Sequence, residues 1–232
     1  MIEGEGVRSG VAILIAAMNE EKGIGPTIQE IHRYVRDAHI LVVDGRSSDR
    51  TVEIAKDLGA AILVQERKGK GDAVNQGIKK LGADFEHLVL IDADFTYPAQ
   101  SIPKMIEIMK RNKDVGMVVG NRFNPNAKFR HASNDLFYLG NRMLAFAQHM
   151  VNGVRLEDPL SGLRIVRNEL AQRWNLKSQG FDVEVEMNYA VENGGYRIVE
   201  IPIAYRSRLG EKKLKFHHGL VILRRMFAEG LS

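Results

Sequence analysis

Residues 88–94 read Leu-Val-Leu-Ile-Asp-Ala-Asp, an apolar run that ends in two carboxylates one residue apart. The run predicts a buried strand over 88–91, and Asp92 and Asp94 follow where that strand leaves the core. Because alternate residues of an extended segment point the same way, both carboxylates can converge on one cation. Their oxygens suit a hard ion such as Mg²⁺ or Mn²⁺. Aspartate is also common in solvated turns after strands, so the pair alone leaves both interpretations open.

Strand and helix patterns alternate through the first half of the chain. The predicted strands cover 11–17, 39–43, 61–64, 88–91 and 115–120, and the predicted helices cover 26–35, a segment from Ser48 capped by Ser47 or Ser48, 71–81 and 101–109. This alternation predicts an α/β fold with a Rossmann-like, mostly parallel central sheet flanked by helices on both faces. Ligands of such sheets bind outside the carboxyl ends of the strands.

The second half of the chain has less regular patterns. We expect helices over 136–151, 181–193 and 216–227, and a strand over 196–205 that Pro202 places near an edge of the sheet. Residues 11–232 are expected to form one domain after a polar lead-in over 1–10. Its last element is predicted to be a basic amphipathic helix over about 216–229.

The composition excludes several classes of protein. The 232 residues include no cysteine, so disulfides, zinc–thiolate sites and cysteine nucleophiles are absent, which fits a reducing cytosol. The hydrophobic fraction of 44% allows a sizeable core. No apolar stretch approaches the ~20 residues that span a bilayer, and the N-terminus lacks the pattern of a signal peptide.

Basic residues gather near the C-terminus of a chain whose net charge is +4. Seven lysines and arginines lie between Arg206 and Arg225, with Glu211 as the one acid. Such a segment indicates an anionic partner, which can be nucleic acid, phosphate groups or an anionic membrane surface. A solvated helix face is the alternative. Aromatic residues are few, at 7%, and are not interleaved with the basic ones, which disfavours nucleic acid.

Acidic residues follow three of the predicted strands. Glu20 comes after the first strand, Asp44 directly after the second, and the pair Asp92 and Asp94 after the fourth. Because the carboxyl ends of parallel strands share one edge of the sheet, we expect these side chains to gather there. Asp44 can there accept hydrogen bonds from a base or a ribose. Three acidic strand ends favour a binding site over three separate turns.

A basic, glycine-rich loop opens the helix predicted over 71–81. Residues 67–73 read Arg-Lys-Gly-Lys-Gly-Asp-Ala, so Gly69, Lys70 and Gly71 lie at the start of this helix. Backbone amides at a helix N-terminus suit phosphate. The loop lacks the Gly-Lys-Ser/Thr ending of a Walker loop, so the pattern is weak when taken alone.

Further polar residues follow the fifth strand. Arg122 lies close to its end, and Ser161 and Arg164 lie in the segment 158–164. Arginine suits bidentate phosphate binding, although a surface ion pair is the alternative for each. The histidines are not spaced as a metal site, and no Gly-x-Ser-x-Gly elbow predicts a hydrolase triad.

Taken in order, these motifs resemble the family 2 glycosyltransferases of GT-A fold. The motifs of the first half are Asn19-Glu20, Asp44-Gly-x-Ser-x-Asp49, Gly69-Lys70-Gly71-x-Ala73, Asp92-Ala-Asp94 and Gly120-Asn-Arg122. Later segments are similar to polyprenyl-phosphate sugar transferases, of which dolichyl-phosphate mannose and glucose synthases are known examples. These segments are Asp158-Pro-Leu-Ser161-Gly162-Leu-Arg164, Glu186-Met187-x-Tyr189, Glu200-Ile-Pro202-Ile and Arg206-x-Arg208-x-Gly210-Glu-x-Lys213-Leu214. The resemblance covers nearly the whole chain.

The resemblance implies inverting transfer of a hexosyl group from a UDP- or GDP-linked sugar to a polyprenyl or dolichyl phosphate, with Mg²⁺ or Mn²⁺. It implies that Glu20 and Asp44 contact the nucleoside beside the loop 69–73, and that Asp92 and Asp94 surround the metal. It places Arg122, Ser161, Arg164, Arg208 and Lys213 against the phosphates. The residues predicted to be catalytic are Asp94, Arg122, Arg208 and Lys213.

Thr96 is the clearest departure from the family pattern. It stands where mannose synthases typically have glutamine, two residues after the second aspartate of the pair. A threonine hydroxyl can still reach a metal-bound water, so we predict Thr96 as a third member of the metal site. The opening Ala17-Met18-Asn19-Glu20 also differs from the Pro-x-Tyr-Asn-Glu of many relatives.

A lipid acceptor implies an enzyme bound peripherally to the cytoplasmic face of a membrane. Leu220, Leu223 and Phe227 in the last predicted helix can face either the body of the protein or a bilayer, with Arg224 and Arg225 toward headgroups. Two alternatives stay open: a transferase of the same fold with a soluble acceptor, and an inactive module that binds a sugar nucleotide or nucleic acid. The sequence leaves the sugar, the base, the polyprenol length, the metal and the oligomeric state undetermined.

Overall fold

The computed structural model describes residues 10–123, 135–211 and 218–230. Within this part of the chain, seven strands form one sheet in the order β3-β2-β1-β4-β6-β5-β7. The strands are β1 Val11–Ala17, β2 His39–Asp44, β3 Ala61–Val64, β4 His87–Leu90, β5 Val115–Asn121, β6 Arg164–Arg167 and β7 Arg197–Pro202. All neighbouring strands pair in parallel except β6, which is antiparallel to both β4 and β5.

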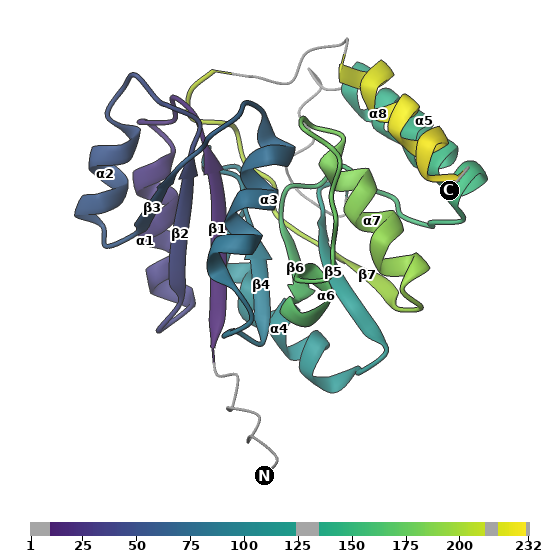
Figure 1. Cartoon of the computed structure of the whole chain (residues 1–232), viewed down its shortest axis with the longest axis horizontal. Helices are drawn as coiled ribbons and strands as arrows, with labels where there is room; N and C mark the ends of the chain where they lie inside the picture. Colours follow the sequence, from purple (N-terminus) through teal and green to yellow (C-terminus); the bar gives the residue numbers. More distant parts are fainter. Residues whose placement is uncertain (1–9, 124–134, 212–217, 231–232) are drawn as a thin grey trace.

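Helices cover both faces of the sheet (Figure 1). They are α1 Ile24–Tyr34, α2 Thr51–Asp57, α3 Lys70–Leu81, α4 Ile102–Arg111, α5 Asp135–Asn152, α6 Asn168–Ala171, α7 Val183–Asn193 and α8 His218–Gly230. Buried side chains of α1, α2 and α4 pack on one face, and those of α3, α6 and α7 pack on the other. The predicted α/β class with a mostly parallel sheet is therefore confirmed.

Sequence patterns did not predict the short helix α6 or the antiparallel strand β6 that precedes it. The strand is only four residues long, Arg-Ile-Val-Arg, and an arginine stands at each end. Such a segment has the composition of a loop, but Arg164 is fully buried and donates to backbone carbonyls, as does Arg167. The buried hydrogen bonds satisfy the guanidinium groups, so the strand can lie inside the sheet between β4 and β5.

The predicted start of α2 was also wrong. The helix begins at Thr51 rather than near Ser48, because the preceding serines have other partners. The Ser47 hydroxyl donates to Asp44 at 2.6 Å, and the Ser48 amide donates to Oδ1 of Asn19 at 2.8 Å. Asp49 instead accepts from the Thr51 amide at 3.0 Å and from the Glu21 amide at 3.1 Å, so the strand-to-helix connection is tied to the loop after β1.

The loops that follow the parallel strands lie together at one end of the sheet. Because six of the seven strands run in the same direction, their carboxyl ends meet at the upper end in Figure 1. The chain after β7 returns across this end as residues 203–211, which we call the crossing segment. Its Arg206 amide donates to the Thr96 carbonyl at 3.0 Å, and its Leu209 amide donates to the Asp94 carbonyl at 3.1 Å.

Helices α5 and α8 form a pair beside the sheet, at the upper right of Figure 1. Ile222 and Met226 of α8 pack against α5 and α7, and Leu223 is partly buried in the same cluster. The opposite side of the pair is an exposed apolar surface, which we call the outer face. The outer face consists of Leu139, Met143, Phe146, Met150, Leu220, Val221 and Phe227. Of the residues expected to face the protein or a bilayer, Leu220 and Phe227 are therefore exposed and Leu223 packs inward.

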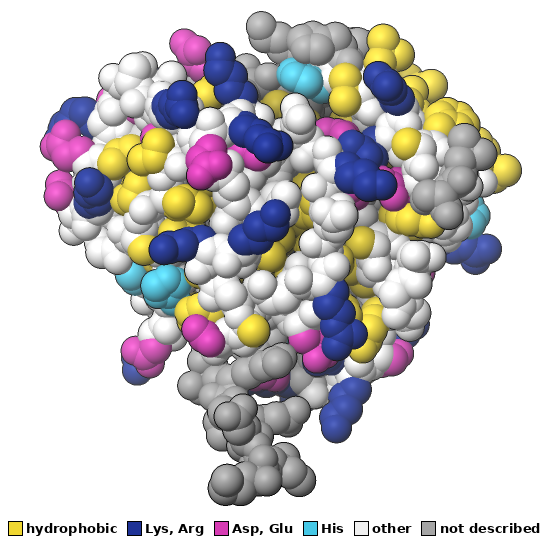
Figure 2. Space-filling view, viewed as in Figure 1, with side chains coloured by type: hydrophobic (Ala, Val, Ile, Leu, Met, Phe, Trp, Pro, Cys, Tyr) yellow, Lys and Arg dark blue, Asp and Glu magenta, His cyan; other side chains and the backbone are white. Residues whose placement is uncertain are grey.

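Figure 2 shows hydrophobic side chains gathered at the edge of the molecule where α5 and α8 lie. The exposed fractions of Met143, Phe146 and Met150 are 65%, 66% and 66%, and that of Leu220 is 73%. No helix in the described ranges is long and apolar enough to cross a membrane.

Candidate active site

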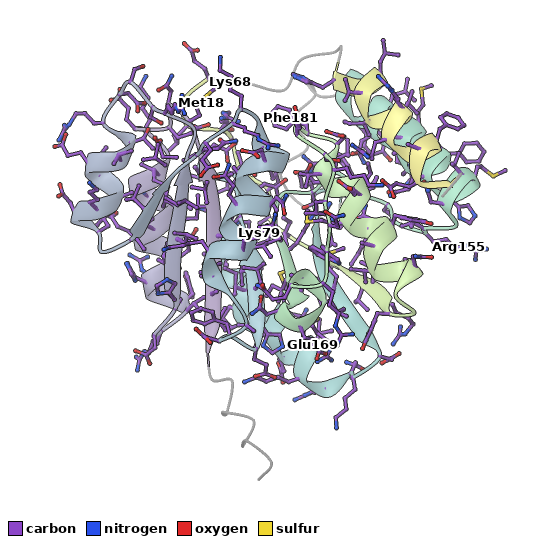
Figure 3. The ribbon with its side chains drawn as sticks, in the orientation of Figure 1. Met18, Lys68, Lys79, Arg155, Glu169 and Phe181 are labelled. Carbon is purple, nitrogen blue, oxygen red and sulfur yellow. The ribbon has the colours of Figure 1, made fainter. Side chains whose placement is uncertain are left out.

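The candidate site lies at the carboxyl ends of the strands. Figure 3 marks this end by Met18, Lys68 and Phe181, which come from the loops after β1, before α3 and before α7, and marks the opposite end by Glu169. Parallel strands followed by crossovers bring their loops to one edge, so residues far apart in sequence meet here.

Asp92 follows β4 and is held by a lysine from another element. Oδ1 of Asp92 lies 2.6 Å from Nζ of Lys70, the first residue of α3. The same ammonium lies 2.7 Å from Oε1 of Glu184, in the first turn of α7. Burial opposes ionisation of Asp92, but Lys70 outweighs burial and lowers the pKa of this carboxyl. Burial likewise works to lower the pKa of Lys70, whereas Asp92 and Glu184 raise it, so Lys70 and Asp92 both stay charged.

Asp94 is held from the opposite side by the crossing segment. Its Oδ2 lies 2.7 Å from Nη1 of Arg208, and Arg208 also forms an ion pair with Glu20 from the loop after β1. Its Oδ1 accepts hydrogen bonds from the hydroxyl and the amide of Thr96 at 2.6 and 3.1 Å. Burial and the charge of Asp92 raise the pKa of Asp94.

Gly162 leaves the space that the Asp92 carboxylate occupies. A Cβ at this glycine would lie 2.6 Å from Cγ of Asp92, closer than real contacts allow. The Gly162 amide donates to the Tyr97 hydroxyl at 2.6 Å, which fixes the backbone at this distance. Asp92, Gly162, Lys70 and Glu184 also line a cavity of about 10 Å³, which is room for one water molecule.

The two aspartates have the donor chemistry of a divalent-cation site. Mg²⁺ commonly binds through one or two carboxylates plus substrate phosphates and keeps several waters, so Asp92 and Asp94 fit it without a larger cage. Among the described residues, no three or more His, Cys, Asp or Glu side chains form such a cage. Thr96, predicted as a third ligand, is 1% exposed, and its hydroxyl orients Asp94 instead.

Arg122 lies at the end of β5 and is fixed by a buried acid. Its guanidinium donates to both carboxylate oxygens of Asp158, at 2.7 Å each, and Asp158 is fully buried. Burial opposes the charge of Arg122, but Asp158 outweighs it and raises the pKa. The guanidinium also stacks over the ring of Tyr205 in the crossing segment, 5.5 Å from its centroid. Arg122 is therefore a permanently charged, rigid group.

Three other predicted site residues have buried side chains with partners inside the protein. The Asp44 carboxylate accepts from the Ser47 amide and hydroxyl, and the Ser161 hydroxyl donates to the Gly120 carbonyl at 2.5 Å. Arg164 is fully buried and donates to backbone carbonyls. These three side chains do not reach the surface at the carboxyl ends of the strands, which we call the rim. They instead stabilise the elements around the site.

The glycine-rich loop differs from a phosphate cradle in this structure. Gly69 and Gly71 pack against the backbone of 178–179, and the Gly71 amide donates to the Gln179 carbonyl at 3.0 Å. A Cβ at Gly71 would lie 2.7 Å from the carbonyl carbon of Ser178. The glycines allow this close approach, and their effect is to aim Lys70 into the site.

Sequence patterns missed Glu184 as a partner of Lys70 and did not assign the Arg122–Asp158 pair. Glu184 is 4% exposed and sits one turn before Asn188, in the helix of the Glu186-Met187-x-Tyr189 motif but outside that motif. Its one local signal is an acid in the first turn of a helix, which is common for reasons of the helix dipole alone. Lys213, predicted to be catalytic, and residues 1–9 of the lead-in predicted over 1–10 lie outside the described residues.

Comparison with known proteins decides the family of this site. A family model described as glycosyl transferase family 2 matches residues 12–173, which is more than half of the chain. The chain belongs to glycosyl transferase family 2. The match to the family model thus confirms the resemblance that the ordered motifs of this glycosyltransferase indicate.

Curated relatives of the glycosyltransferase include lipid-linked sugar transferases. A dolichyl-phosphate hexose transferase of Haloferax volcanii is 34% identical over 88% of this chain and 86% of that protein. A dolichol-phosphate mannosyltransferase of Pyrococcus furiosus is 30% identical over 88% of this chain, but the match spans only 59% of that longer protein. A polyprenol monophosphomannose synthase of Mycolicibacterium smegmatis is 25% identical over 87% and 80% of the two chains.

Solved structures confirm the GT-A fold of the glycosyltransferase. Glucosyl-3-phosphoglycerate synthase from Mycobacterium tuberculosis, in complex with Mg²⁺ and UDP, superposes with a TM-score of 0.73. The superposition covers 96% of this chain and 78% of that chain at 21% identity. At this identity the likeness carries the fold alone.

Proposed function

We propose that this glycosyltransferase transfers a hexosyl group, with inversion, from a UDP- or GDP-linked sugar to a polyprenyl phosphate. The observation that carries the proposal is the rim itself, where Asp92 and Asp94 meet three cationic side chains, those of Lys70, Arg122 and Arg208. Carboxylates suit the cation of a nucleoside diphosphate, and the arginines suit phosphates. The names of the relatives with 34%, 30% and 25% identity support the lipid-phosphate acceptor.

The chemistry of the acceptor explains why the rim carries so many cations. A phosphate monoester has a second pKa of about 6, so the attacking oxygen is already anionic at neutral pH and needs no strong base. Attack on the anomeric carbon, from the face opposite the leaving diphosphate, brings two anions together. Arg122, held by Asp158, and Arg208 lower this repulsion and position the acceptor phosphate.

A divalent cation belongs to this proposal as the partner of the donor. Mg²⁺ or Mn²⁺ held by Asp92 and Asp94 would neutralise the charge that develops on the leaving diphosphate. Thr96 fixes one oxygen of Asp94, and Gly162 leaves room for the carboxylate of Asp92. In the proposed complex the nucleoside lies beside a wall of the site that consists of Glu20, Asp44 and the loop around Gly69.

We further propose that this chain forms a single GT-A domain, which binds peripherally to the cytoplasmic face of a membrane. A polyprenyl chain resides in the bilayer, and the outer face of α5 and α8 offers aliphatic and aromatic side chains to it. Arg142 and Arg224 are exposed on the same two helices and suit anionic headgroups. The absence of cysteine fits the reducing compartment.

A transfer assay tests the proposed reaction. The full chain is incubated with labelled UDP- and GDP-hexoses, Mg²⁺ or Mn²⁺, and either a short-chain polyprenyl phosphate or 3-phosphoglycerate. We expect a labelled polyprenyl-phosphate sugar and loss of the product after chelation. Label on 3-phosphoglycerate alone would favour the soluble-acceptor alternative, and no product with any pair would favour an inactive binding module.

Asp94→Asn is the variant that tests the role of the carboxylate pair. We expect transfer to fall at least about 100-fold, because the amide carries no charge for the cation. Circular dichroism should show an unchanged fold. Asp57→Asn, at an exposed position at the end of α2, makes the same chemical change away from the rim and should retain activity. Near-normal transfer by Asp94→Asn contradicts the metal assignment.

A further inference from the structure

The two aspartates of the pair belong to two matched ion bridges. In each bridge a cationic side chain lies between one aspartate and a glutamate from a different element. The bridges are Asp92–Lys70–Glu184 and Asp94–Arg208–Glu20. The bridges therefore tie the end of β4 to α3 and α7 on one side, and to the crossing segment and the loop after β1 on the other.

The charges of the two bridges do not balance. Four carboxylates face two cationic groups, which leaves a formal charge of minus two. Three of these carboxylate side chains, those of Glu20, Asp94 and Glu184, are only 5–6% exposed, so water screens the excess poorly. Arg122, which is paired with Asp158, and Arg164, which faces Glu184, offset only part of this excess. Uncompensated buried charge is costly, and a divalent cation would remove the remainder.

The two aspartates are not equally open to such an ion. The described residues place a donor on Oδ1 of Asp92 but none on Oδ2, so Asp92 can take a ligand without losing Lys70. Asp94 has donors on both oxygens, from Thr96 on Oδ1 and from Arg208 on Oδ2. A cation that binds Oδ2 of Asp94 meets the positive charge of Arg208 2.7 Å from this oxygen, so the two compete for it.

Arg208 keeps a second ion pair when it leaves Asp94. Its second carboxylate, that of Glu20, lies outside the Asp pair and is 6% exposed. The backbone around Arg208 has anchors of its own, because the Leu209 amide donates to the Asp94 carbonyl and Arg206 pairs with Glu30 at 2.7 Å. The guanidinium can therefore change partners while the crossing segment stays in position.

We propose that Arg208 competes with the divalent cation for Asp94, and that Glu20 is a positioning residue that retains Arg208 when the cation binds. The inference rests on the proposed function for the presence of the cation. Without the ion, Arg208 links Asp94 to Glu20, and it turns toward the phosphates only after the ion has taken Asp94. Arg208 thus contacts the phosphates of the substrates only when the cation is bound.

Titration of Mn²⁺ into the full chain without any sugar nucleotide, followed by electron paramagnetic resonance, tests this competition. Arg208→Ala removes the competitor and should tighten Mn²⁺ binding about tenfold, within the range of couplings between contacting charges. Arg208→Lys, a milder change, should shift the affinity in the same direction, because one ammonium replaces the two-sided guanidinium fork. Arg111→Ala removes the same charge at an exposed position at the end of α4, away from the crossing segment, and should change the affinity less than about twofold.

A double-mutant cycle isolates the role of Glu20. Glu20→Gln should weaken Mn²⁺ binding when Arg208 is present, because Arg208 then has Asp94 as its remaining carboxylate, and should have little effect in Arg208→Ala. Equal weakening in both backgrounds would mean that Glu20 acts on the ion directly, and would overturn its positioning role. Unchanged or weaker binding by both Arg208 variants would overturn the competition, whereas failure of transfer alone would bear on the proposed function.

Discussion

At the scale of single residues, the site depends on contacts that a side chain one carbon larger would destroy. Gly162 faces the carboxylate of Asp92 so closely that a Cβ would lie 2.6 Å from Cγ. Its amide is fixed by the buried Tyr97 hydroxyl, so the backbone cannot retreat without losing a hydrogen bond. The carboxylate is the group that must move when Gly162 is enlarged.

Gly162→Ala should therefore displace Asp92 and lower the transfer rate at least about 100-fold, the cost of a misplacement of about 1 Å. The free energy of unfolding should fall by about 1–3 kcal/mol because of overpacking. Gly140→Ala in α5 is the matched control, since its Cβ would meet nothing within 4 Å. Urea unfolding and the transfer assay measure both effects, and an active Gly162→Ala enzyme would contradict this role of Gly162.

At the scale of secondary-structure elements, most of the helices and strands were predictable, and the missed strand has a clear cause. Strands such as 11–17 and 61–64 and the helix end at Gly82 follow from local patterns of apolar residues and glycine. Strand β6 has no such pattern, because its place between β4 and β5 depends on buried arginines that find carbonyls only in the folded chain.

The pair of helices α5 and α8 carries a prediction about membranes. Phe146→Ser together with Met150→Ser should lower binding to vesicles that contain anionic lipid by about tenfold or more. The reason is that two exposed apolar side chains no longer enter the bilayer, and full burial of each contributes up to about 1.5–3 kcal/mol to binding. Cosedimentation measures the bound fraction. Tyr34→Ser, at an exposed position on α1, is the control and should bind normally.

The same vesicle measurement distinguishes other partners of the outer face. Unchanged vesicle binding by the double variant would remove this face from the membrane interface. Sedimentation of the wild type as a dimer, reversed by the same substitutions, would instead assign the face to a second copy of the chain.

At the scale of the whole molecule, a buried histidine couples stability to pH. His87 at the start of β4 is 1% exposed, and its Nε2 has no partner among the described residues. Burial, with Arg167 and Lys110 nearby, lowers its pKa below the ordinary value of about 6.5 despite the neighbouring Glu86. Below about pH 6.5 the unfolded chain therefore binds a proton that the folded chain resists.

Stability should thus fall as the pH drops through about 6.5, and this part of the loss should disappear in His87→Leu. The measurement is the free energy of unfolding in urea at several pH values between about 5 and 8, for both proteins. The comparison uses the slopes, because leucine also changes the packing. Parallel slopes for the two proteins would contradict this role of His87.

The sequence by itself determined the alternation of strands and helices and the acids that follow the strands. Hydrophobic period, caps and glycines act over a few residues, so these features can be read without the fold. The tertiary structure alone decided which charges meet. Arg208 and Glu20 are 188 residues apart, and Lys70 meets both Asp92 and Glu184 because β4 ends, and α3 and α7 begin, at one edge of the sheet. Ion pairing depends on distance in space, which local patterns do not encode.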